Sequence, residues 1–97
     1  MKVEFTATAL RQLSTIAEEL EAFSPAWAAE VGGSIERTLR RLSDHPFSGR
    51  AQDVPGVRKA VVLKGRYLLY YEVLLERGVV RMLAIVHPRR RRPYRDG

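Results

Sequence analysis

His87 has the chemistry best suited to moving a proton, because histidine is the side chain that changes charge near neutral pH. It follows directly on an apolar run that ends at Val86. In that place a histidine acts either as a general acid–base or as a structural residue that hydrogen-bonds a neighbouring backbone group. Since the other histidine and the carboxylates lie far from it in sequence, we favour the structural role.

Five arginines and no acidic residue occupy positions 89 to 95, and they supply most of the formal net charge of +6. The five are Arg89, Arg90, Arg91, Arg92 and Arg95. Such a cationic end favours an anionic partner: a nucleic acid, an acidic protein segment or a lipid surface. The alternative is a solvated tail that keeps the protein soluble. We favour the anionic partner, since the charge is large for 97 residues.

Metal and cofactor chemistry is not expected from the composition. The chain has no cysteine, which excludes a thiolate metal site, and with only two histidines, His45 and His87, a multi-histidine site is not expected. No apolar run approaches the ~20 residues of a membrane span, and Met1-Lys2 leads into an alternating pattern rather than a signal peptide. We therefore expect a cytoplasmic protein with no cofactor and no membrane contact.

A short strand and a first helix open the chain. Residues 3–5 alternate in polarity, and Thr6 is a favoured helix N-cap, with Phe5 and Leu10 at the two positions of a hydrophobic staple. Apolar residues then recur every three or four positions, which predicts an amphipathic helix of about four turns. The predicted apolar stripe consists of Leu10, Leu13, Ile16, Ala17 and Leu20.

A second helix begins at Ser24-Pro25 and ends at Pro46. The two helices form an antiparallel hairpin. Gly32-Gly33 inside the second helix indicates either a close approach of the helices or a kink. Trp27 is expected to pack between this helix and the sheet.

Three strands are predicted after the loop at residues 45–56. They span residues 57–63, 67–75 and 79–86, with turns at Lys64-Gly65 and at Glu76-Arg77-Gly78. Almost every residue of the last two is β-branched, aromatic or long and apolar, so their hairpin should lie at the centre of the sheet and be covered on both faces. Tyr67, Tyr70 and Tyr71 could stack on bases, but tyrosines on a central strand are more commonly core residues.

The order of elements predicts an α+β fold: an N-terminal short strand, a helical hairpin and a three-stranded antiparallel meander, with the helices packed on one face of the sheet. Residues 1–97 form a single domain in this interpretation, and residues 89–97 are its basic tail.

The ordered motifs resemble the ParE/RelE superfamily of toxins from bacterial type II toxin–antitoxin modules. The motifs are V-E-F-T-x-x-A-L-x-x-L, S-P-x-x-A, L-S-D-H-P-F-S-G-R, P-G-V-R-K, Y-L-L-Y-Y-E-V and V-R-M-L-A-I-V-H-P-R-R. The resemblance covers residues 3–92 and is closer to ParE than to RelE.

This resemblance implies a toxin that is neutralised by a cognate antitoxin with a flexible, acidic C-terminal segment, in a hetero-oligomer that meets DNA only through the antitoxin. ParE relatives inhibit DNA gyrase, whereas RelE relatives cut messenger RNA in the ribosome. The two activities use one fold, so the choice must come from the site. A third possibility is a non-toxic protein that acts only with its antitoxin in operator binding.

The residues at the positions of the RelE catalytic groups favour a gyrase inhibitor without catalytic residues. Val61 and Leu68 stand where RelE-like enzymes carry a lysine and an arginine. A nuclease would have to rely on the remaining candidates, Lys59, His87, Arg89, Arg90 and Tyr94.

Two further sets of residues come from the resemblance. Those assigned to target binding are Arg58, His87, Arg89, Arg90, Arg91 and Arg92. Gly49 and Arg50 are assigned to the structure of the loop before the sheet, where Arg50 could bond backbone carbonyls.

Overall fold

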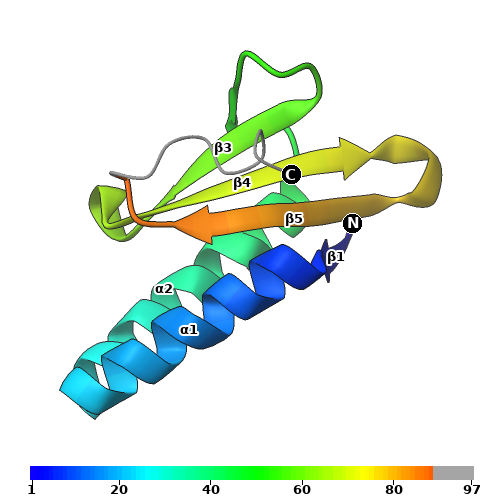
Figure 1. The fold of residues 1–97 in the computed structure, drawn as a ribbon. Helices are drawn as coiled ribbons and strands as arrows, with labels where there is room; N and C mark the ends of the chain where they lie inside the picture. The colour runs from blue at the N-terminus through cyan, green and yellow to red at the C-terminus, as the bar shows by residue number, and fades with distance from the viewer. Residues whose placement is uncertain (89–97) are drawn as a thin grey trace.

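The computed structural model describes residues 1–88, which form two helices and five strands. In chain order these are β1 (Lys2–Phe5), α1 (Ala7–Phe23), α2 (Pro25–Asp44), β2 (Arg50–Ala51), β3 (Val57–Val62), β4 (Tyr67–Leu74) and β5 (Val79–Val86). Short 3₁₀ turns, Leu63–Gly65 and Leu75–Arg77, join the last three strands. The helices run side by side on one face of the sheet and extend beyond it (Figure 1). Neither helix of this range is long and apolar enough to cross a membrane.

The strands form one mixed sheet in the order β1-β5-β4-β3-β2. The expected α+β fold, with a meander of β3, β4 and β5 and both helices on one face, is confirmed. The sheet is wider than predicted, because β1 adds in parallel to β5 and Arg50–Ala51 pairs with β3. The sequence missed β2, since two residues inside a loop carry no alternation, and it missed the parallel pair, since its two strands lie at opposite ends of the chain.

Both helices start where the sequence predicted. The hydroxyl of Thr6 accepts a hydrogen bond from the Ala9 N–H (3.1 Å), and that of Ser24 accepts one from the Trp27 N–H (3.2 Å). Each serves a backbone donor that the first turn of a helix leaves without a partner.

Leu10 does not belong to the buried stripe of α1, contrary to the prediction. Its side chain is 55% exposed, and Ala17 is exposed as well, whereas Ala9 is fully buried. The observed stripe is Ala9, Leu13, Ile16 and Leu20. Leu10 lies roughly 100° around the helix from Ala9, which turns it away from the sheet.

Helix α2 is continuous through Gly32 and Gly33, so neither a kink nor a close helix approach explains this pair. A Cβ on Gly32 would meet nothing within 4 Å, and one on Gly33 would meet only the side chain of Arg37 (3.3 Å). Nothing in the packing requires either glycine.

The β4–β5 hairpin is buried on both faces, as the sequence predicted. On the helix side, Leu69 and Tyr71 of β4 lie in the main core together with residues of both helices. On the other side, Tyr70, Ala84 and Val86 form a second cluster. Between Met82 and Ala84 the pairing with β4 shifts by one residue, so Leu83 forms a bulge.

The loop that follows α2 is tied to β4 by Tyr71. The buried hydroxyl donates a hydrogen bond to the Pro46 carbonyl (2.8 Å) and accepts one from the Gly49 N–H (2.8 Å). A Cβ on Gly49 would lie 2.3 Å from this hydroxyl oxygen, so a larger residue would force the loop off the strand. The phenol of Tyr71 thus helps to fix the loop and the start of β2.

We predict that Tyr71→Phe lowers the free energy of unfolding by about 1–3 kcal/mol, because the Gly49 N–H and the Pro46 C=O lose their shared partner. Urea denaturation measures this change. The control is Tyr67→Phe, a half-buried tyrosine of the same strand, with an expected change within about 0.5 kcal/mol. Equal losses in the two variants would contradict the role of the Tyr71 hydroxyl.

The same hydroxyl makes the free energy of unfolding depend on pH in the alkaline range. Burial raises the pKa of the Tyr71 phenol; the Gly49 hydrogen bond and the charges of Arg58 and Arg41 oppose this only in part. An unfolded tyrosine ionises near pH ~10, so above that pH the folded state retains a proton that the unfolded state loses. The protonated Tyr71 phenol therefore contributes fully to the free energy of unfolding below pH ~10. This contribution is lost as the pH rises through the pKa that the phenol has in the folded state.

We therefore predict a steeper fall of the urea midpoint above pH ~10 for the natural protein than for Tyr71→Phe, which has no phenol to ionise at this position. Parallel pH profiles for the two proteins would refute the effect.

Candidate functional site

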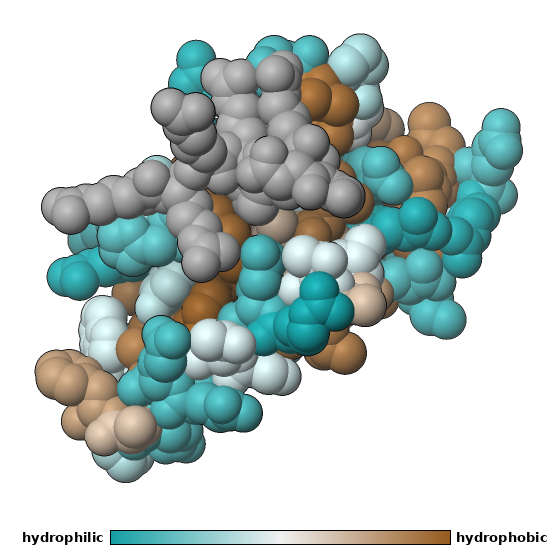
Figure 2. All heavy atoms as spheres, viewed as in Figure 1, coloured by the Kyte–Doolittle hydropathy of each residue, from teal (hydrophilic) through white to brown (hydrophobic). Residues whose placement is uncertain are grey.

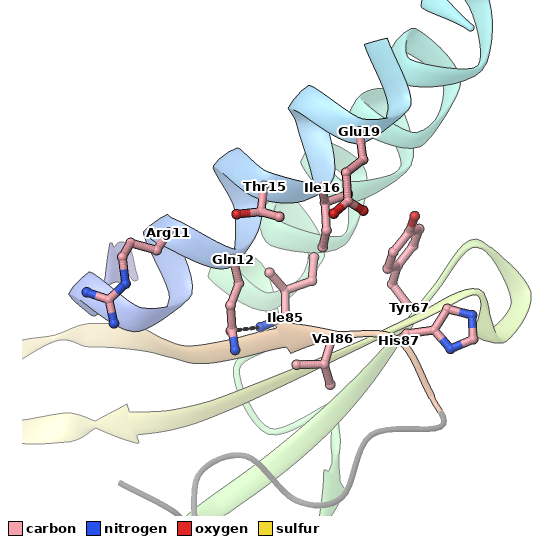
Figure 3. Close-up of a pocket in the computed structure, with 9 residues that line it drawn as sticks. All are labelled: Arg11, Gln12, Thr15, Ile16, Glu19, Tyr67, Ile85, Val86 and His87. Carbon is pink, nitrogen blue, oxygen red and sulfur yellow. Dashed lines mark hydrogen bonds between the residues drawn. The ribbon is translucent and has the colours of Figure 1, made fainter. Parts of the chain in front are cut away.

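The edge of β5 continues beyond its partner β1. The pairing of the two strands stops at Met82, because the chain turns into α1 at Thr6. Side chains from the start of α1 meet the next backbone groups: the Thr6 hydroxyl donates to the Leu83 carbonyl (3.2 Å), and Gln12 Oε1 accepts from the Ile85 N–H (2.9 Å; Figure 3). Helix α1 is thereby fixed against the end of β5.

A cavity of about 430 Å³ lies between α1 and this end of the sheet. Its lining residues are Arg11, Gln12, Thr15, Ile16, Glu19, Tyr67, Ile85, Val86 and His87 (Figure 3). The isoleucines and Val86 supply apolar surface, and the other side chains give it a polar rim. Such a cavity can receive a peptide segment by burying an apolar side chain and pairing its polar groups at the rim.

Helix α1 brings two charged side chains, Arg11 and Glu19, to the cavity that His87 lines. Sequence reasoning missed both, because their approach to β5 depends on the parallel pairing of β1, which no local pattern signals. The guanidinium group suits an anion, and the carboxylate suits a cationic or hydrogen-bond-donating group of a ligand.

Lys59 lies away from this cavity. It pairs with Tyr70, which pairs with Ala84, three residues before His87. From strand spacing and rise, the Cα atoms of Lys59 and His87 are roughly 14 Å apart. Lys59 shares a face with Tyr70, away from the helices, whereas His87 follows the alternation of Ile85 on the helix side.

An apolar row separates Lys59 from the end of the sheet. Val61 pairs with Leu68, and Leu68 pairs with Val86. Val61 and Leu68 are the two positions where the sequence lacks the lysine and arginine of the RelE pattern. The register places them side by side, where they offer only hydrocarbon surface.

Arg58 supports the loop after α2, whereas the sequence assigned that contact to Arg50. Arg58 Nη1 donates to the carbonyls of Phe47 (3.2 Å) and Gly49 (2.8 Å), and its guanidinium carbon lies 5.2 Å from the centre of the Phe47 ring. Arg50 is exposed on β2, opposite Lys59 of β3. Arg58 pairs with Tyr71 in the row of Met82, so the structure does not bring it together with His87.

Two of the three tyrosines of β4 are core residues, as expected, and the third, Tyr67, is half-buried. Tyr70 and Tyr71 are 4% and 0% exposed, so neither presents a face for stacking on a base. Trp27 packs against the core, and the guanidinium carbon of Arg66 lies 5.6 Å from the centre of its ring.

The remaining candidates, Arg89 to Arg92 and Tyr94, lie outside the described residues. Within residues 1–88, no group of three or more histidine, aspartate or glutamate side chains could hold a metal ion.

Residues 3–92 match the family described as ParE toxin of type II toxin–antitoxin system, parDE. A protein of Sinorhizobium fredii named "Putative toxin Y4kP" is 27% identical over 92 residues, which cover 95% of this chain and 93% of the relative.

Solved structures from toxin–antitoxin systems share the fold. A chain of the chromosomal ParDE system of Pseudomonas aeruginosa superposes with a TM-score of 0.73 at 21% identity, covering 90% of this chain and 95% of that one. A chain of the intact Escherichia coli RelBE toxin–antitoxin complex gives a TM-score of 0.68 at 16% identity, covering 92% and 98%.

We predict that Gln12→Ala lowers the free energy of unfolding by about 0.5–1.5 kcal/mol, because the Ile85 N–H loses its acceptor. The Ile85 amide should also exchange its hydrogen faster. Gln12→Glu keeps an oxygen acceptor at the same reach, so it should restore slow exchange. Unchanged exchange of this amide in Gln12→Ala would show that the bond does not hold α1 on β5.

Proposed function

Because the chain belongs to the ParE toxins of type II toxin–antitoxin systems, we propose that it inhibits DNA gyrase and that a cognate antitoxin neutralises it. Toxin–antitoxin complexes among the structures of the same fold support the antitoxin as a partner. The fold itself is common to ParE-like and RelE-like chains, so the choice of target rests on the site.

The separation of Lys59 from His87 carries the choice of an inhibitor over a ribonuclease. Metal-free cleavage of RNA needs a base, an acid and a charge stabiliser within hydrogen-bond reach of the same few atoms. Here the lysine and the histidine lie two strands apart and leave the sheet on opposite faces. The apolar row of Val61, Leu68 and Val86 lies beside Lys59 where further cationic groups would be required.

For contact with the target we propose the basic end of the sheet, defined as His87, the arginines Arg89 to Arg92 that follow it in sequence, and two residues that the fold adds. Those two are Lys64 and Arg66, exposed on the turn from β3 to β4. Since Val62 pairs with Tyr67 and Leu68 pairs with Val86, this turn lies at the same end of the sheet as His87. Clustered cations of this kind attract an acidic protein surface or DNA held by the enzyme.

For the antitoxin we propose the cavity between α1 and the end of β5 as one binding site. An inserted apolar side chain would cover Ile16 and Ile85, and polar groups of the segment would meet Arg11 and Glu19 at the rim. An antitoxin segment bound in this cavity, which His87 lines, would also block the access of the target to the basic end of the sheet.

Two assays on the purified protein test the proposal. Inhibition of gyrase supercoiling, with accumulation of cleaved DNA, is the expected result. Cleavage of messenger RNA in a translating extract, with gyrase unaffected, would establish the ribonuclease instead. Neither effect, together with operator binding in the presence of antitoxin, would identify a non-toxic co-regulator.

We predict that a chain ending at Pro88 loses gyrase inhibition while binding antitoxin with an affinity within about threefold of the full chain, because the removed residues carry most of the excess charge. A second variant, with Arg89 to Arg92 replaced by glutamine, keeps the length of the chain. It therefore distinguishes the loss of positive charge from the loss of the segment itself. Full inhibition by both variants would remove the arginines from the mechanism.

A further inference from the structure

Phe47 is an exposed aromatic residue on a loop that several hydrogen bonds hold in place. Its side chain is 51% exposed even though Arg58 lies against its ring. The Tyr71 hydroxyl bonds the residues on both sides of it, Pro46 and Gly49. Ser48 N–H also donates to the His45 carbonyl (3.1 Å). Unlike Phe23, which is exposed at the end of a helix, the Phe47 ring is therefore presented to solvent by a loop that side chains of β3 and β4 hold in place.

The guanidinium group beside the ring has unused donors. Both carbonyl bonds of Arg58 are made through Nη1. Arginine carries five N–H donors, and no acceptor among residues 1–88 bonds the Nε and Nη2 groups of Arg58. Those groups form the edge that binds a carboxylate with two parallel hydrogen bonds.

The elements that hold this loop are cationic. Residues 40–59 carry the basic side chains Arg40, Arg41, Arg50, Arg58 and Lys59, of which Lys59 lies on the opposite face of the sheet. Asp44 and Asp53 are the acidic residues of the same segment, and Glu72 on the neighbouring strand is paired with Arg81 (3.6 Å). The excess of positive charge favours a ligand that carries carboxylates.

We propose that Phe47 and Arg58 form a docking site for an acidic, apolar segment of the cognate antitoxin. One carboxylate of the segment binds the Nε and Nη2 edge of Arg58, and an adjacent apolar side chain covers the Phe47 ring. The inference rests on the proposed function only in requiring an antitoxin. It assigns to Arg58 an antitoxin contact in place of a target contact.

The position of the site favours the antitoxin over the target. Arg58 lies in the row of Met82, five residues before His87, so the site is roughly 17 Å along the sheet from the basic end proposed for the target. An extended antitoxin segment can cover both places at once. Aromatic residues and arginine are also enriched at protein interfaces, and the hydrogen bonds that already hold the loop lower the entropy cost of binding.

The test compares Phe47→Ala with Phe23→Ala. Phe23, at the tip of the helical hairpin, is 82% exposed, so it is a matched control for the loss of an exposed phenyl ring. The probe is the purified product of the adjacent gene, chosen because its co-expression restores growth. Isothermal titration calorimetry should give about a tenfold weaker affinity for Phe47→Ala, and less than a twofold change for Phe23→Ala. Thermal unfolding of each variant confirms that it is folded.

Each other outcome decides against the proposal. Affinity of Phe47→Ala within twofold of the natural chain would overturn it. So would reduced gyrase inhibition with unchanged antitoxin affinity, which would assign Phe47 to the target. If the natural chain neither bound the product of the adjacent gene nor arrested growth, the proposed function itself would be refuted, and the docking site with it.

Discussion

Burial of the β4–β5 hairpin on both faces is the constraint on which the rest of the structure depends. On the helix side it places Tyr71 under α2, where one hydroxyl can hold the loop that carries Phe47. On the other face the cluster around Tyr70 makes the sheet a barrier between Lys59 and the helices. At its end, β5 runs past β1 and forms one wall of the cavity beside His87. A hairpin that was covered on one face only could not position the Phe47 loop, Lys59 and the cavity wall in this way.

Much of this arrangement could be predicted from the sequence, because its signals are local. Thr6 and Ser24 mark the helix starts by their capping hydroxyls, and the apolar run of the last two strands indicates a central hairpin. What the sequence missed depends on contacts between distant segments. Leu10 fits the helical spacing as well as Ala9 does, and only the position of the sheet decides which of them is buried.

The candidate site shows the same limit. The sequence singled out His87 but not Glu19, which lines the same cavity because the parallel pairing of β1 holds α1 against β5. It likewise assigned the support of the loop to Arg50, although the alternation of β3 gives that contact to Arg58. Conversely, the sequence alone showed that Val61 and Leu68 replace the basic residues of the RelE pattern. The strand register adds that Val61 and Leu68 are direct neighbours in the sheet. One fold can thus present different chemistry through a few positions on its strands.

The most direct test of the account is to express the chain without its antitoxin and follow DNA integrity and protein synthesis in the same cells. The account predicts double-strand breaks that appear while labelled amino acids are still incorporated. Immediate arrest of translation with cut messenger RNA and intact DNA would contradict it.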